Sequence, residues 1–223
     1  MNTHPSLEAR HAVAAQPLPD PVIHIVDDDP GVSTALARLL AASCHEVRQH
    51  PDAQEFLQTY ESGHGCLLVD VWMPGIDGLE LQARLAQRGD CPPIIFLTCC
   101  ADVSTCACAM RGGAVDYLTK PVDEELLLPA IDRALAHSAS LLGARRLQST
   151  IEGRLKTLTP REREVLTHVM NGRLNKQIAA DLGSAEKTVK VHRARAMEKM
   201  GVRSVAELVR MVERARAAAS RLS

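Results

Sequence analysis

Five residues in the first 120 positions have the chemistry of a phosphoryl-transfer site. They are an adjacent pair of carboxylates, a third carboxylate, a hydroxyl and a lysine: Asp27, Asp28, Asp70, Thr98 and Lys120. Clustered carboxylates suit Mg²⁺, which prefers hard oxygen ligands, and without the cation at least one of their pKa values should rise. Asp70 could attack phosphorus to give an aspartyl phosphate, while Lys120 and the Thr98 hydroxyl contact the transferred oxygens.

Short apolar runs precede these residues and indicate the strands that would position them. Strands are expected at residues 21–26, 46–50, 66–69, 94–97 and 115–118, and helices at 30–40, 52–60, 79–85, 104–111 and 123–135. This alternation predicts an α/β fold, a doubly wound, flavodoxin-like, five-stranded parallel sheet. Such sheets bind ligands beyond the carboxyl ends of their strands, where all five candidate residues fall.

Residues beside the expected nucleophile and lysine also suit such a site. Gly75 and Gly78 permit tight turns after Asp70. Pro121 restricts its loop and could have a cis bond that aims Lys120. An acidic pair alone would more often be a solvated loop or a helix cap. The placement of all five residues at successive strand ends favours a functional edge.

Charge divides the 223-residue chain into two parts of opposite sign. Up to His137 there are 8 Lys and Arg against 19 Asp and Glu, and from Ser138 onward there are 18 against 8. This asymmetry predicts an acidic module joined to a nucleic-acid-binding one. All aromatic residues lie in the acidic part, so the basic part has no platform for stacking unpaired bases. Double-stranded DNA is therefore the expected partner.

The composition also indicates where in the cell the protein is found and the oxidation state of its cysteines. No apolar run is long enough to span a bilayer, and the first residues lack the apolar centre of a signal peptide. We expect a cytoplasmic protein without a membrane partner, with residues 1–21 as a disordered extension. Seven cysteines without an export signal are typical of reduced thiols. For the cluster Cys99, Cys100, Cys106 and Cys108 we favour packing over redox or metal sensing, because its spacing is not that of structural zinc sites.

The basic part has the pattern of four short helices. It predicts a small all-α domain at residues 157–223, after a helical linker at 138–156. Two capping boxes and one asparagine mark expected helix starts: Thr159–Glu162, Ser204–Glu207 and Asn175. The third helix, at about 186–200, is rich in Lys and Arg and follows a short helix and a tight turn. This arrangement is typical of a helix-turn-helix whose third element enters the major groove.

The sequences IVDDD, LLVDVWMPG, IIFLT and DYLTKP resemble the receiver domain of two-component response regulators, over residues 22–137. The resemblance implies that a sensor histidine kinase phosphorylates Asp70, with Lys120 and Thr98 at the phosphoryl group. It also implies an ion site and a switch pair: Asp27, Asp28, Asp70 and the backbone carbonyl of Trp72 hold Mg²⁺, and Thr98 and Tyr117 move on phosphorylation. Trp72 and the Cys99–Cys100 pair depart from residues often found there, which leaves the phosphoryl lifetime open.

The sequences LTPREREVL, LNKQIAADLG and TVKVHRARAMEKMGV resemble the LuxR-type helix-turn-helix of the NarL/FixJ response-regulator group. This resemblance implies base contacts from Lys190, Val191 and Ala194. Contacts or charge near the DNA backbone are expected from four more residues: Lys187, Thr188, Arg193 and Arg195. The combined expectation is a phosphorylation-dependent transcriptional regulator and not an enzyme. It would bind promoter DNA, form a homodimer when phosphorylated and meet RNA polymerase.

Two other functions remain open from the residues alone. A Mg²⁺-dependent phosphohydrolase could use Asp70 as its nucleophile, but Trp72 stands where a second carboxylate would act as general acid. A redox- or metal-controlled DNA-binding protein could instead take its input from the thiol cluster. In that case oxidant-dependent DNA affinity would survive the substitution Asp70→Asn.

Overall fold

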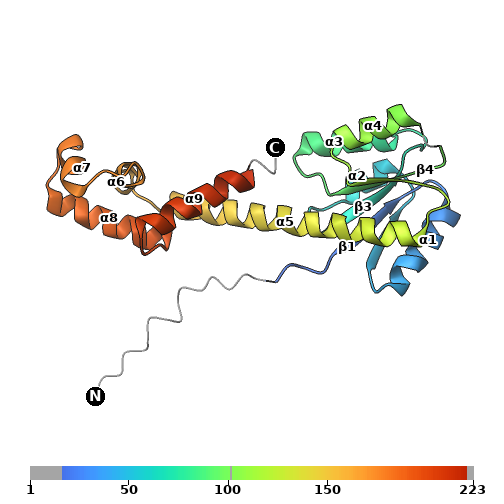
Figure 1. The fold of residues 1–223 in the computed structure, drawn as a ribbon, viewed down its shortest axis with the longest axis horizontal. Helices are drawn as coiled ribbons and strands as arrows, with labels where there is room; N and C mark the ends of the chain where they lie inside the picture. Colours follow the sequence, from blue (N-terminus) through green and yellow to red (C-terminus); the bar gives the residue numbers. More distant parts are fainter. Residues whose placement is uncertain (1–16, 101, 220–223) are drawn as a thin grey trace, which may run out of the picture. The chain divides into compact units, whose positions relative to one another are not determined.

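The computed structural model describes residues 17–100 and 102–219, which fold as two compact units that divide between Leu142 and Gly143 (Figure 1). Residues 1–16, which make up most of the expected disordered extension, lie outside the described residues. Residues 17–21 have no regular secondary structure, and the first strand begins at Val22.

The N-terminal unit contains a parallel sheet with the strand order β2-β1-β3-β4-β5. Its strands are β1 (Val22–Val26), β2 (Glu46–His50), β3 (Gly65–Asp70), β4 (Ile94–Thr98) and β5 (Asp116–Thr119). Its helices are α1 (Pro30–Ala42), α2 (Ala53–Thr59), α3 (Gly78–Arg88), α4 (Val103–Arg111) and the start of α5 (Glu124–Lys156). This order confirms the predicted doubly wound five-stranded sheet.

Helices cover both faces of the sheet, and alternating side chains of the strands enter two separate cores. Val69 and Phe96 pack on one face with residues of α2, α3 and α4. Leu68 and Leu97 pack on the other face with residues of α1 and α5. The apolar run of β3 ends in Asp70, and the strand is buried along its whole length, as such a run predicts.

Helix α5 is longer than predicted. The sequence pattern predicted a helix over 123–135 and a helical linker at 138–156. The linker is helical, as predicted, and it continues the preceding helix without a break to Lys156. Its first turns pack in the core of the N-terminal unit, and the Ser138 hydroxyl accepts a 3.0 Å hydrogen bond from the Gly65 backbone N–H. Residues 138–156 include no proline, so none of them removes a helical hydrogen bond in the way proline would.

The C-terminal unit contains the end of α5 and four further helices. These are α6 (Pro160–Met170), α7 (Asn175–Asp181), α8 (Glu186–Met200) and α9 (Val205–Ala219). The predicted capping box at α6 is confirmed, because Thr159 and Glu162 each accept from the other's backbone N–H. The predicted cap of α7 is wrong: Leu174 is the N-cap residue, without a side-chain cap, and Asn175 is the first helical residue.

Two small cores hold these helices together. One joins α6, α8 and α9 around Leu166, Met200 and Leu208. The other joins α6, α7 and α8 around Val165 and Ile178. Helix α8 contributes to both cores and is therefore central to the unit. None of the helices in the described ranges is both long and apolar enough to cross a membrane.

Candidate phosphorylation site and DNA-recognition helix

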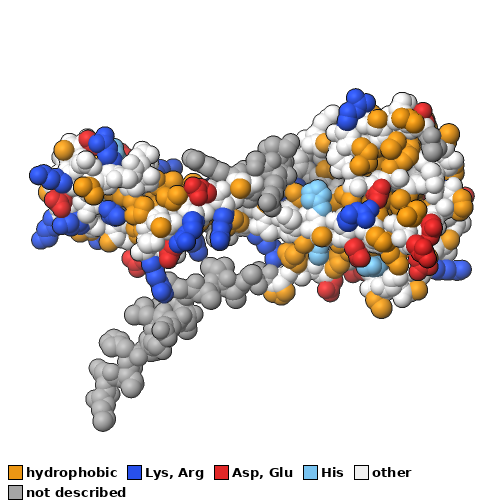
Figure 2. All heavy atoms as spheres, in the orientation of Figure 1, with side chains coloured by type: hydrophobic (Ala, Val, Ile, Leu, Met, Phe, Trp, Pro, Cys, Tyr) orange, Lys and Arg blue, Asp and Glu red, His pale blue; other side chains and the backbone are white. Residues whose placement is uncertain are grey.

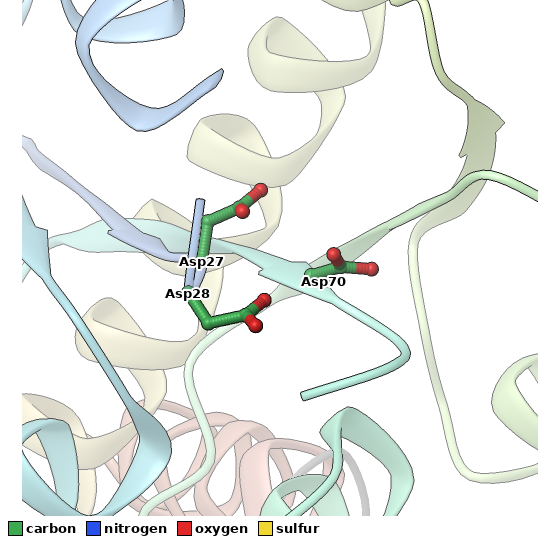
Figure 3. A group of neighbouring side chains, drawn as sticks. All are labelled: Asp27, Asp28 and Asp70. Atoms are coloured by element: carbon green, nitrogen blue, oxygen red, sulfur yellow. The ribbon is translucent and has the colours of Figure 1, made fainter. Parts of the chain in front are cut away.

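Three carboxylates meet at the carboxyl edge of the sheet. Asp27 and Asp28 directly follow β1, and Asp70 ends the neighbouring strand β3. One oxygen from each lies within 4.8 Å of the others, and Figure 3 shows Asp27 and Asp28 projecting toward the end of β3. Asp27 and Asp70 are buried, whereas Asp28 is exposed. Oxygen donors arranged in this way, with one open to solvent, fit the ligand preference of Mg²⁺.

Lys120 joins this group from the loop after β5. Its Nζ donates hydrogen bonds of 2.7 Å to Oδ2 of Asp27 and to Oδ2 of Asp70. Burial alone would lower the pKa of Lys120, but the hydrogen bonds to the two carboxylates outweigh it and leave the pKa raised. The Lys120–Pro121 peptide bond is cis, as predicted. The ammonium is therefore a fixed positive charge beside the expected nucleophile.

Asp27 has a raised pKa, which confirms that one carboxylate of the cluster is harder to ionise. Burial is the main cause, and the nearby Asp70 adds to it. The hydrogen bond from Lys120 opposes the rise, as does a 3.0 Å bond from the Asp29 backbone N–H. Desolvation, more than repulsion between carboxylates, thus makes this site favourable for a cation.

The turn after β3 fixes the backbone around Asp70. The Trp72 backbone N–H donates to Oδ1 of Asp70 at 3.2 Å, and the indole is 59% exposed beside the site. Gly75 has a φ of 80°, in the left-handed region that its expected turn requires. A Cβ at Gly78 would lie 2.5 Å from the Asp70 carbonyl oxygen, so only glycine fits there.

The two expected switch residues lie on neighbouring strands and make no bond to the carboxylates. The buried Thr98 hydroxyl donates to the Cys100 carbonyl at 3.0 Å and accepts from the Cys100 N–H at 3.2 Å. The Tyr117 ring lies 6.2 Å from the ring of Phe96. Among the described residues, no hydrogen-bond partner reaches the buried Tyr117 hydroxyl. Thr98 is thus bound to its own loop, and the tyrosine points into the unit.

The packing interpretation of the thiol cluster is wrong for most of its members. Cys99, Cys100 and Cys108 are exposed, and Cys106 is half-buried. The reason is that α4 buries only Ala109 and leaves its other side chains near solvent. Within residues 17–100 and 102–219, these thiols do not form a group of three with ligand atoms close enough to share a metal.

The predicted DNA-contacting residues lie on one broad face of α8. Lys187, Thr188, Lys190, Val191, Ala194 and Arg195 are exposed, and Arg193 is half-buried. Val189, Ala196 and Met200 are buried on the opposite face. Figure 2 shows Lys and Arg side chains over the C-terminal unit, consistent with its excess of positive charge. A long basic helix with its polar face free suits the major groove.

Two side-chain contacts on α8 were not predicted. Lys190 pairs with Glu186 one turn earlier, at 3.1 Å. Arg193 donates a 2.9 Å hydrogen bond to the amide oxygen of Asn175. The first contact has the ordinary i,i+4 spacing and was open to prediction. The second joins two helices and had no local signal in the sequence.

Comparison with known proteins agrees with both halves of this description. Residues 23–132 match the family model described as response regulator receiver domain, and residues 156–212 match bacterial regulatory proteins, luxR family. The transcriptional regulatory protein FixJ of Azorhizobium caulinodans is 42% identical, with 85% of this chain and 90% of the relative covered. Nodulation protein W of Bradyrhizobium diazoefficiens is 39% identical, with 86% of this chain and 85% of the relative covered.

A solved structure extends the similarity to three dimensions. The structure of response regulator StyR has a TM-score of 0.81 at 42% identity, and the alignment covers 87% of this chain and 99% of that one. Similarity of this extent spans the sheet, the carboxylate cluster and the helix-turn-helix together. The chain therefore belongs to the response regulators of the NarL/FixJ group, with a receiver domain joined to a LuxR-type DNA-binding domain.

Proposed function

We propose that this transcriptional regulator is switched by phosphorylation of Asp70, with a sensor histidine kinase as the phosphoryl donor. The observation that best supports this is that Lys120 and two further carboxylates surround Asp70 at the end of a buried strand. An oxygen of Asp70 would attack phosphorus of the kinase phosphohistidine. The P–N bond would break, and the imidazole would leave with its electron pair.

The surrounding residues have separate tasks in this step. Asp27, Asp28, Asp70 and the backbone carbonyl of Trp72 would hold Mg²⁺, which when bound neutralises charge on the carboxylates and the phosphoryl group. Lys120 already neutralises Asp70 and would bind a phosphoryl oxygen after transfer. The Trp72 backbone N–H holds one Asp70 oxygen in place, so the other is oriented for attack.

Thr98 and Tyr117 would relay the change. To reach a phosphoryl oxygen, the Thr98 hydroxyl must leave the Cys100 carbonyl, which would alter the loop before α4. The movement of Thr98 would in turn change the space available to the Tyr117 ring. Both motions would act on α4 and β5, which supports this side of the receiver as the output surface.

Exposed apolar side chains on that side support a phosphorylation-dependent homodimer. Val103 and Met110 of α4 are 82% and 45% exposed, and Leu126 of α5 is 59% exposed. Exposed apolar side chains of this size can contribute to a protein–protein contact. A second copy of the chain, with the same surface changed by its own Asp70, would cover them.

The output is promoter DNA. Lys190, Val191 and Ala194 would meet base edges in the major groove, while the flanking Lys and Arg neutralise phosphates. To bind base edges, Lys190 must be released from Glu186. A regulator that binds promoters in this way would meet RNA polymerase there, in the cytoplasm.

Phosphorylation and oligomeric state test this function together. The full chain is incubated with Mg²⁺ and a small acyl phosphate, beside Asp70→Asn, and followed by intact mass and sedimentation velocity. We expect one phosphoryl group and a shift to dimer in wild type only. The phosphorylated protein is then used to select binding sites from random duplex DNA. No label on Asp70 would refute the switch, and repeated turnover of a phosphate ester would favour the hydrolase alternative.

Oxidation is a second candidate stimulus for this protein. It is favoured by the exposure of three thiols, Cys99, Cys100 and Cys108, in and after the loop that Thr98 contacts. A hydroperoxide would oxidise a cysteine thiolate to a sulfenic acid: the sulfur attacks one peroxide oxygen, the O–O bond breaks and water or an alcohol leaves. The expected signature is DNA affinity that changes with hydroperoxide and keeps this response in Asp70→Asn. Substitution of all four cysteines by serine should remove the response. Equal affinity with and without oxidant would exclude this input.

A further inference from the structure

The C-terminal end of α8 is tied to the segment that joins α5 to α6. Arg154, in the last turn of α5, donates a 2.7 Å hydrogen bond from Nη1 to the carbonyl oxygen of Met200, the last residue of α8. Carbonyls in the last turn of a helix lack partners within it and form the negative end of its dipole. A part-buried guanidinium at this point satisfies a carbonyl and fixes the end of the helix.

The neighbouring residue Lys199 makes a second connection to the same segment. Its Nζ lies 3.0 Å from the Thr157 carbonyl oxygen and 2.6 Å from Oε2 of Glu162. That Oε2 also accepts from the Thr159 backbone N–H at 2.9 Å, within the cap of α6. Hydrogen bonds from Lys199 and Thr159 lower the pKa of Glu162, which keeps this carboxylate ionised for the pair.

The residue after α8 leaves room for the guanidinium. Gly201 has a φ of 65° and ends the helix in the left-handed conformation. A Cβ at Gly201 would lie 2.9 Å from Nη1 of Arg154 and 3.1 Å from its Cζ. The guanidinium therefore fills space that only glycine provides. A larger residue at position 201 would push it away from the Met200 carbonyl oxygen.

The anchored end of α8 lies far from the residues expected to contact bases. The helix has 15 residues and is therefore about 22 Å long at about 1.5 Å per residue. Lys190 lies ten residues before Met200, or about 15 Å along the helix, so a tilt of about 5° at the anchored end would move it by about 1.3 Å. A shift of this size is enough to break hydrogen bonds to base edges, which require donor–acceptor distances near 3 Å.

We propose that Arg154 is a positioning residue for DNA recognition, because it holds the end of α8 and so sets the angle at which Lys190 and Val191 meet the bases. The inference rests on the proposed DNA-binding role of α8 and extends it to a residue of α5. The first turns of α5 pack in the receiver core, so the helix that supports recognition is also part of the phosphorylated domain. Loss of Arg154 should reduce discrimination between sequences more than attraction to phosphates.

Arg154→Met tests this in the full-length phosphorylated protein, because it removes the donors and keeps most of the aliphatic stem. Arg146→Met is the matched control, since it removes an exposed positive charge from the same helix. Fluorescence anisotropy is measured with a selected duplex and with its scrambled sequence over a series of salt concentrations. We expect the ratio of the two affinities to fall about three- to tenfold in Arg154→Met. The salt dependence should not change, Arg154→Lys should be intermediate, and Arg146→Met should keep the ratio.

An unchanged ratio in Arg154→Met would overturn the inference. An equal loss on both duplexes, with a salt slope reduced by about one charge, would also overturn it, because Arg154 would then be a phosphate contact. Circular dichroism checks the fold of each variant. If Arg154→Met does not fold, Gly201→Ala takes its place, because the new Cβ displaces the guanidinium; a lower ratio supports the inference and an unchanged one contradicts it. A wild-type protein that selects no duplex would instead refute the proposed function.

Discussion

The imidazole rings of His24 and His50 stack within the receiver, with 5.3 Å between their centroids. Nδ1 of His24 lies 3.0 Å from Nε2 of His50, and the ring of Phe56 packs edge-on against both. Burial lowers the pKa of His24 to about 4, and the charges of His50 and Arg48 contribute. Burial also lowers the pKa of His50. The folded receiver therefore favours two neutral rings.

This pair predicts a loss of receiver stability in mild acid. Because the folded-state pKa values lie below those of the unfolded chain, the contribution is complete above pH 6.5 and is lost as the pH falls toward 4. We expect a loss on the order of 3 kcal/mol over that range. Urea unfolding followed by the fluorescence of Trp72 measures it, since this is the only tryptophan. His24→Gln should flatten the pH dependence, whereas the exposed His137→Gln should not; equal slopes would contradict this account.

Mg²⁺ should stabilise the receiver through the three carboxylates. A cation that binds only the folded state at a hundred times its Kd raises the free energy of unfolding by about 2.7 kcal/mol. Titration with Mg²⁺ should also change the fluorescence of Trp72, whose backbone N–H is bonded to Asp70. Asp27→Asn and Asp28→Asn should each weaken the response at least tenfold. Asp132→Asn, an exposed carboxylate on α5, is the control, and a response that survives in all three variants would exclude this site.

Gly78→Ala should disturb the phosphorylation site itself. Its Cβ would lie 2.5 Å from the Asp70 carbonyl oxygen and 3.1 Å from the Phe96 ring, so the backbone of β3 must shift. We expect a destabilisation of about 1–3 kcal/mol together with slower phosphorylation of Asp70. Gly75→Ala is the comparison, because its Cβ would enter open space and only the positive φ is strained. Both quantities are measured on the full chain, by Trp72 fluorescence and by phosphoryl labelling. Unaltered labelling of Gly78→Ala would show that the strand end tolerates the shift.

Ala185→Ser should stabilise the first turn of α8. Ala185 is the N-cap residue of α8, in extended conformation, and it makes no side-chain cap hydrogen bond. A serine hydroxyl there could accept from a backbone N–H of the first turn, which is worth about 1 kcal/mol. Hydrogen exchange read by mass spectrometry over residues 186–195 should slow about fivefold. Ala185→Val cannot supply the cap and should give no slowing; similar rates in the serine and valine variants would rule out a capping effect.

Much of the receiver could be predicted from the sequence because its signals are local. Buried strands appear as apolar runs, and Asp29 with Pro30 marks the start of a helix. Parallel strands bring their carboxyl ends to one edge, so Asp70 and Lys120 could be placed together before their 2.7 Å contact was known.

The features that could not be predicted depend on contacts between distant segments. No local pattern indicates that Arg154 bonds Met200, or that Ser138 bonds Gly65 across 73 positions. The thiols were placed in the core because cysteine is often buried, but burial depends on which face of α4 meets the sheet. The helical linker was predicted, but its continuity with the helix before it was not, because no local signal near His137 decides whether two helical stretches join.

The two ends of helix α8 differ in their side-chain hydrogen bonds, and this has a consequence for how affinity varies with temperature. Its last turn is fixed by Arg154 and Lys199, whereas its first turn begins at the uncapped Ala185. A helix with these ends frays first at the uncapped one. DNA phosphates can accept hydrogen bonds from the N–H groups of that turn, and binding would then order it. Because ordering costs conformational entropy, the specific complex should weaken on warming more steeply than the nonspecific one.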